Sequence, residues 1–194
     1  MLDFEALREK RTTLEQLVEG LVPADLHRLT DEMVDEMLGI LEGAVDADVT
    51  FLPDDPDAYD RFASDPSEEN IAWTLGHVVV HTTASAEESA ALAATLARGI
   101  EIKERSRAEV PWQEVTSVEQ LRARLEESRR IRHAFLNAWP DCPHYELLYH
   151  PPYPPGANPM NAIGRFVLGL NHDFPHLSQM REDLRQSRAA RGAA

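Results

Sequence analysis

Four segments of this 194-residue sequence have the apolar spacing of helices, and none alternates like a strand. The segments span residues 4–45, 67–98, 116–139 and 159–188. The first contains Pro23, and we expect a break there because a proline inside a helix removes a hydrogen bond. A chain of this length buries one hydrophobic core. The sequence therefore predicts a single all-α domain, residues 1–194, built as a four-helix bundle.

Proline-rich stretches separate these segments. Residues 46–66 hold three prolines among clustered aspartates and predict a long inserted loop. A calcium site there is the less favoured interpretation, because the acids lack the ligand spacing of a calcium-binding loop. Residues 141–159 hold six of the 13 prolines, after which Asn158 and Pro159 are expected to cap and begin the last helix. Residues 189–194 are expected to form a fraying tail.

The third segment has the clearest sequence bounds. At its start, Thr116 with Glu119 or Ser117 with Gln120 has the spacing of a capping box. At its end, Pro140 disfavours the helical conformation in the residue before it. We therefore expect a helix that fills most of this segment.

Charge and cysteine content exclude several classes of protein. The 34 acidic and 19 basic residues give a net charge of -15, which repels nucleic acids and anionic membranes. The single cysteine, Cys142, cannot form an internal disulfide, and the first residues do not resemble a signal peptide. No apolar run approaches the roughly 20 residues that span a bilayer. We expect a cytoplasmic protein that binds a small molecule.

Two pairs of histidines have the i, i+4 spacing, His77 with His81 and His172 with His176. On a helix this spacing puts both side chains on one face, with Cβ atoms about 5–6 Å apart. One such pair and a histidine from another helix can surround a divalent ion and leave positions open for other ligands. By themselves, the residues also allow a second interpretation, chance pairing on a solvated helix face among eight histidines.

His172 and His176 lie off the apolar stripe of their helix and share a face with Arg165, Gly169 and Gln179. This polar face is either solvated or lines a cleft. The stripe itself packs on other helices or on a second subunit, and we predict a homodimer for this reason. The stripe consists of Ile163, Phe166, Leu170, Phe174 and Leu177.

The runs WTLGHVVVH and NHDFPHLSQM resemble the motifs of the DinB-like metal-binding four-helix-bundle superfamily. In that family, a second-helix histidine eight residues after a tryptophan joins two fourth-helix histidines, often followed by a glutamine. The resemblance covers roughly residues 70–188 and implies that His81, His172 and His176 hold one divalent metal. Gln179 matches the glutamine, and we expect it to hydrogen-bond a ligand.

Three features depart from the family pattern. The region from about residue 31 to residue 70 is longer than the usual connection between the first helix and the tryptophan. His77 is an extra histidine. It could hydrogen-bond a residue of the site, act as a fourth ligand or have no role at the site; we favour a hydrogen-bonding role or none. Pro175 should kink the helix next to His176.

An all-histidine set suits zinc or nickel, with iron or copper as alternatives. Such an ion would acidify a bound water or thiol, so both hydrolysis and thiol transfer are chemically open. The resemblance favours thiol transfer, because the family includes bacillithiol transferases and a mycothiol-dependent maleylpyruvate isomerase. Arg165 and Arg129 are candidate anchors for an acidic substrate. The alternatives are a hydrolase, a non-catalytic metal-binding protein and a metal-free helical interaction module.

Overall fold

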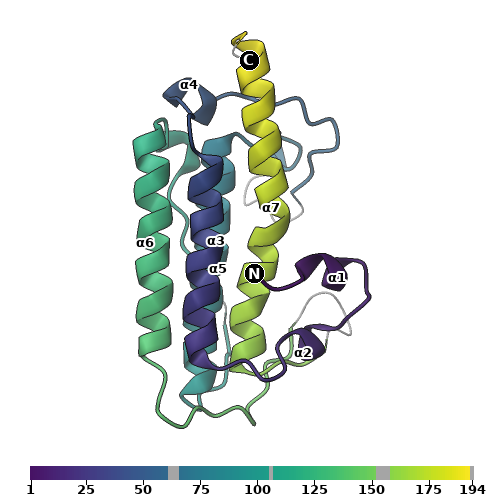
Figure 1. Ribbon diagram of the computed structural model, residues 1–194, viewed down its shortest axis with the longest axis vertical. Coiled ribbons are helices and arrows are strands. Elements are labelled where there is room, and N and C mark those ends of the chain that lie inside the picture. The colour runs from purple at the N-terminus through teal and green to yellow at the C-terminus, as the bar shows by residue number, and fades with distance from the viewer. Residues whose placement is uncertain (61–65, 105–106, 152–157, 193–194) are drawn as a thin grey trace.

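The computed structural model describes residues 1–60, 66–104, 107–151 and 158–192 of the chain. Within these ranges the chain forms α-helices, two short 3-10 helices at Pro66–Glu68 and Trp112–Glu114, and no strands (Figure 1). The all-α prediction is therefore confirmed. The α-helices are α1 Phe4–Arg8, α2 Leu14–Leu17, α3 Pro23–Ile40, α4 Asp46–Val49, α5 Leu75–Ala97, α6 Val118–Asn137 and α7 Ala162–Ala190.

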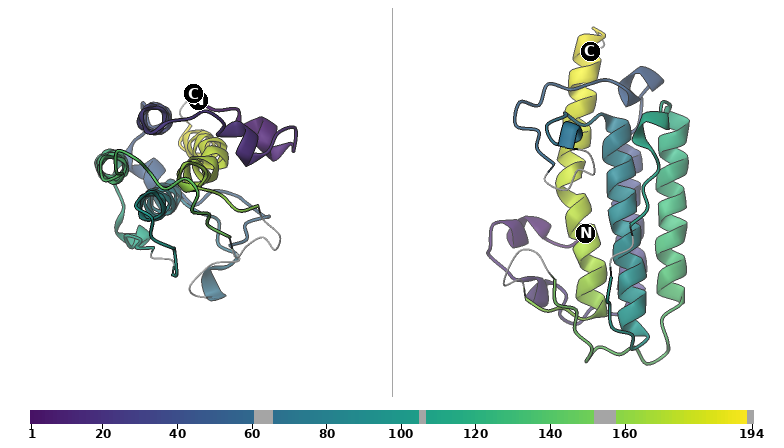
Figure 2. Two further views of the ribbon diagram at one scale, coloured as in Figure 1. Left: turned by 90° about the horizontal axis from the view of Figure 1, so that it is seen from below. Right: turned by 180° about the vertical axis from the view of Figure 1, so that it is seen from behind.

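The four long helices α3, α5, α6 and α7 form the bundle. Helix α5 packs against α6 and α7, and α3 packs against the same two helices. Seen along the bundle axis in Figure 2, α3 lies diagonally opposite α5, and α6 lies diagonally opposite α7. The short helices α1 and α2 lie beside one end of the bundle (Figure 1). The predicted four-helix bundle is confirmed. Its hydrophobic core lies between the neighbouring helices.

The prediction of one helix over the residues before Pro23 is wrong. The chain forms two short helices before Pro23 rather than one, because Thr13 and Gln16 make a capping box that starts α2. Gly20 has a φ of 76°, a left-handed conformation that ends the helical path. Pro23 is the first residue of α3. A backbone N–H at this position makes no hydrogen bond within the helix, so proline fits there without loss.

Helix ends elsewhere also follow local caps. Helix α5 begins at Leu75 rather than near residue 67, because the Thr74 hydroxyl accepts the backbone N–H of His77. Helix α7 begins after Asn161, whose side chain caps Gly164, so the expected start at Asn158 and Pro159 is wrong. Helix α6 has the Ser117–Gln120 capping box and ends before Pro140, as expected.

The predicted loop at residues 46–66 contains the short helix α4, and its residues 61–65 lie outside the described residues. The predicted tail begins too early, because α7 continues to Ala190; residues 193 and 194 are not described. Within the described residues, no helix is long and apolar enough to cross a membrane.

The apolar stripe of α7 is buried within the single chain. Four of its residues, Ile163, Phe166, Leu170 and Leu177, are at most 4% exposed, and Phe174 packs against the same core. The stripe therefore finds its partners on the other helices of the bundle. The homodimer stays a prediction, and this surface no longer supports it.

Helices α5 and α7 approach closely at Gly169, one turn before His172. A Cβ at Gly169 would lie 2.6 Å from the Cβ of Ser89 and 3.4 Å from the Cα of Ala86. We expect Gly169→Ala to destabilise the fold by about 1–3 kcal/mol, because the two helices must move apart. Urea denaturation measures this loss. Gly39→Ala is the matched control, since a Cβ at this exposed helix position meets nothing within 4 Å; it should be neutral or stabilise by up to about 1 kcal/mol.

Candidate metal centre

Three histidines converge at the interface of α5 and α7. His81 comes from α5, and His172 and His176 come from successive turns of α7. One nitrogen from each ring lies within 4.8 Å of the others, and the Nε2 atoms of His81 and His172 are 3.1 Å apart. All three side chains are half-buried. Among the residues that the structure describes, no other group of three histidine, cysteine or acidic side chains has this arrangement.

The polar face of α7 thus lines a helix interface and is not a fully solvated surface. The close approach at Gly169 brings the two backbones together one turn before His172. Pro175 does not interrupt α7, which is one continuous helix across both histidines. Both rings of the pair therefore stay on the face that meets His81, as the i, i+4 spacing predicts.

Gln179 holds the ring of His176. Its side-chain oxygen Oε1 lies 2.7 Å from Nδ1 of His176. An amide oxygen only accepts hydrogen bonds, so this Nδ1 carries the proton of the neutral ring and Nε2 keeps its lone pair. The nitrogen that faces the other histidines is therefore ready to act as a ligand, and Gln179 occupies the position expected of a hydrogen-bonding partner.

His81 contacts two side chains from the segment before the second 3-10 helix. Nη2 of Arg107 lies 2.9 Å from Nδ1 of His81, and Oε1 of Glu109 lies 3.6 Å from the same nitrogen. Arg107 and Glu109 also form an ion pair with each other. When Arg107 donates to Nδ1, the neutral ring carries its proton on Nε2. Metal binding through Nε2 requires the other tautomer, for whose Nδ1–H Glu109 is the available acceptor.

Burial disfavours the protonated forms of His81 and His176. Loss of solvent lowers the pKa of His176 to about 4, with a further contribution from the neighbouring His172. Burial likewise lowers the pKa of His81 well below its usual value, and the nearby His172 ring and Arg107 guanidinium act in the same direction. Because only a neutral imidazole binds a metal, the donor set fits a divalent cation.

His77 lies between two indole rings. Its ring stacks on Trp73, with centroids 4.5 Å apart, and on Trp112, with centroids 4.8 Å apart. Trp73 also contacts His81 and His176, at centroid distances of 4.4 and 5.9 Å. His77 is absent from the group of three converging nitrogens. His77 therefore packs against Trp73, which in turn contacts two of the three histidines.

The partly buried stack makes stability dependent on pH, because loss of solvent lowers the pKa of His77 to about 4. The unfolded chain protonates near pH 6.5, so this contribution to stability is complete above pH 6.5 and is lost as the pH falls toward 4. At pH 5 we expect the loss to be on the order of 1–2 kcal/mol. Urea denaturation of chelator-treated protein at pH 7.5 and 5 measures it. His77→Phe keeps an aromatic ring and should reduce the difference; an unchanged difference would contradict this origin.

The two arginines singled out from the sequence lie in other surroundings. Arg165 is 4% exposed and its Nη1 donates to the hydroxyl of Ser89 at 2.7 Å. Arg129 forms ion pairs with Asp31 on α3, at 3.0 Å, and with Asp35, at 2.5 Å. Arg107 contacts His81, a member of the group.

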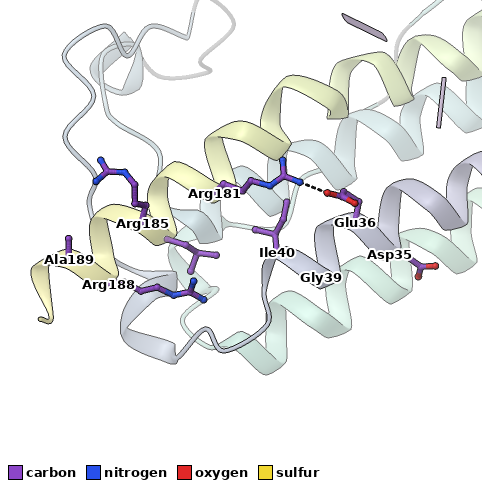
Figure 3. Close-up of a pocket in the computed structure, with 9 residues that line it drawn as sticks. Asp35, Glu36, Gly39, Ile40, Arg181, Arg185, Arg188 and Ala189 are labelled. Atoms are coloured by element: carbon purple, nitrogen blue, oxygen red, sulfur yellow. Dashed lines mark hydrogen bonds and ion pairs between the residues drawn. The ribbon is translucent and has the colours of Figure 1, made fainter. Parts of the chain in front are cut away.

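A groove of about 640 Å³ lies between α3 and the C-terminal half of α7, as Figure 3 shows. Arg181 of α7 pairs with Glu36 of α3 across it. None of the three converging histidines lines this groove. Its lining residues are Asp35, Glu36, Gly39, Ile40, Arg181, Leu184, Arg185, Arg188 and Ala189.

Sequence reasoning missed Arg107 and Glu109 and assigned no role to Trp112. They belong to the connection between α5 and α6, which has no periodic pattern and no motif. Their contacts join residues about 30 positions apart along the chain, such as His77 and Trp112. The one available signal was composition, since tryptophan is rare in exposed connections.

Comparison with known proteins gives one finding. Residues 6–180 match the family described as the DinB superfamily. This match covers most of the chain and includes all three histidines. No curated protein and no solved structure matches.

Proposed function

The chain belongs to the DinB superfamily, and we propose that it is a metal-dependent enzyme of the thiol-dependent transferase type. In this proposal His81, His172 and His176 hold one divalent transition metal, zinc or nickel. The observation that carries it is the convergence of three imidazole nitrogens within 4.8 Å from two helices. Three neutral donors satisfy part of a metal's coordination sphere and leave positions open for a thiol or water.

Such an ion supplies a positive charge that deprotonates a bound thiol or acidifies a bound water. The side chain of His172 is 36% exposed, so the histidine group has contact with solvent. Trp73 provides an apolar wall against His81 and His176 that reduces the access of bulk water. These features favour binding of a small thiol together with a second, partly apolar substrate.

Arg107 is the best-placed group to bind an acidic substrate. Its guanidinium contacts His81, and its partner Glu109 is 42% exposed, so the ion pair between them is weak and can open. A substrate carboxylate would then replace Glu109 as the partner of Arg107. Glu109 would then be free to accept the Nδ1–H of His81. Substrate binding at Arg107 would therefore favour the tautomer of His81 that binds a metal through Nε2.

In the transfer, the thiol loses its proton to solvent and its sulfur forms a bond with an electrophilic carbon of the substrate. The leaving group departs with the electron pair of the bond that breaks. Residues of this chain would bind and orient the partners: the imidazoles would hold the ion, and Arg107 would hold the acid group of the substrate. The proposal assigns no further side chain to the proton.

Cobalt-substituted protein tests this function, because the visible spectrum of cobalt reports its ligands. Cysteine and glutathione serve as probe thiols. We expect either one to change the spectrum of the wild-type protein, and the His172→Ala, His176→Ala double variant to show no such change. An unchanged wild-type spectrum at millimolar thiol, together with hydrolysis of test esters or amides, would instead favour the hydrolase.

A further inference from the structure

A buried ion pair crosses the interior of the bundle. Nη1 of Arg132 on α6 lies 3.0 Å from Oδ2 of Asp173 on α7, and the two side chains are 1% and 0% exposed. Helices α6 and α7 are diagonal in the bundle, so the pair spans its centre (Figure 2). Nε of Arg132 also lies 3.1 Å from the hydroxyl of Ser128, which holds the guanidinium in place.

Asp173 directly follows the candidate ligand His172. Its second oxygen, Oδ1, lies 3.8 Å from Nδ1 of His172. Both atoms are buried, and neither has a hydrogen-bond partner. A carboxylate oxygen accepts hydrogen bonds, and a protonated Nδ1 donates one, so the two atoms are chemically complementary. A ring rotation that shortens this distance by about 1 Å would satisfy both.

We propose that Asp173, held by Arg132, positions His172 for metal binding by accepting a hydrogen bond from its Nδ1–H. The proposal rests on the metal site proposed above. It makes Asp173 and Arg132 positioning residues, since neither side chain belongs to the group of converging nitrogens.

The tautomer of His172 connects this pair to the metal. Its Nε2 is the atom 3.1 Å from Nε2 of His81, so Nε2 faces the site and Nδ1 faces Asp173. A carboxylate behind Nδ1 favours the tautomer that leaves Nε2 free and makes that nitrogen a better donor. Arg132 places a positive charge 3.0 Å from this carboxylate, on the side away from His172's Nδ1. Asp173 and Gln179 are then the acceptors behind the two histidines of α7.

If the ion pair only stabilised the fold, its replacement would leave zinc affinity unchanged. Replacing a buried ion pair by apolar residues of similar volume is often neutral or stabilising. The double variant Arg132→Met, Asp173→Leu should therefore fold with unchanged helicity. If the pair also positions His172, the same variant loses roughly 10- to 100-fold in zinc affinity. Affinity and stability thus separate the two roles.

Zinc affinity is measured by competition with a chromogenic chelator, in tag-free protein, alongside thermal unfolding. Asp48→Asn is the matched control, because Asp48 is also buried and paired with an arginine, Arg191, at 2.7 Å. We expect the control to keep the wild-type affinity. Wild-type affinity in a folded double variant would overturn the positioning role, whereas a wild-type protein that binds no zinc would overturn the metal site itself.

Nitrogen-15 NMR of the histidine rings provides a readout that requires no core variant. In zinc-bound wild-type protein, we expect His172 to carry a slowly exchanging, downfield-shifted proton on Nδ1. Absence of a proton on this nitrogen would overturn the proposal, even if the double variant failed to fold.

Discussion

Replacing His81, His172 or His176 by alanine is expected to reduce zinc affinity by more than the roughly 10- to 100-fold that the loss of an outer hydrogen-bond partner costs. Each replacement removes one of only three nitrogens that lie within 4.8 Å of one another. Alanine leaves space at a half-buried position without adding an alternative donor. Chelator competition in tag-free protein measures the loss.

His77→Ala is the control within the same sequence motif. Its ring stacks between Trp73 and Trp112, so its removal should lower stability and change zinc affinity far less than the three ligand variants do. The ranking of the four variants is the decisive result. An equal loss of affinity in His77→Ala would indicate a site of four histidines and contradict the assignment.

The second large effect concerns stability. Arg132→Met is expected to destabilise the fold by about 3–5 kcal/mol, because it leaves the carboxylate of Asp173 buried without its partner. Replacing both residues, as Arg132→Met, Asp173→Leu, should recover most of this loss. Urea denaturation at pH 7.5 compares the single and double variants.

Arg130→Met on the same helix is the matched control for this effect. Arg130 pairs with Glu127, but its side chain is 72% exposed, so the pair should contribute no more than about 0.5 kcal/mol. A loss of stability in Arg132→Met as small as that in Arg130→Met would contradict the stabilising role of the buried ion pair described here.

Helical spacing predicted the pairing of His172 with His176 because it is a local property, whereas His81 was added to them by the resemblance to the DinB-like family. An i, i+4 pair stays on one face wherever the helix begins, so errors in the helix ends did not affect the pairing of His172 with His176. Those errors arose from side-chain caps, such as Asn161 for α7 and Thr74 for α5. Several residues near each expected boundary can cap a helix, and tertiary packing decides which one does.

The surroundings of the site could not be predicted, because they depend on contacts between distant segments. Arg107 and Glu109 reach His81 from an aperiodic connection. Asp173 is the clearest case: it directly follows a candidate ligand, yet its partner Arg132 lies on the diagonally opposite helix. Diagonal pairing in a bundle leaves no spacing pattern in the sequence.

The central claim is that His81, His172 and His176 hold one divalent metal. Its most direct test is the metal content of the protein purified without a histidine tag or nickel resin, measured by mass spectrometry of the elements. We expect one equivalent of zinc or nickel per chain in the wild type, and its loss in the His172→Ala, His176→Ala double variant. Stoichiometric metal retained in that double variant would contradict the claim.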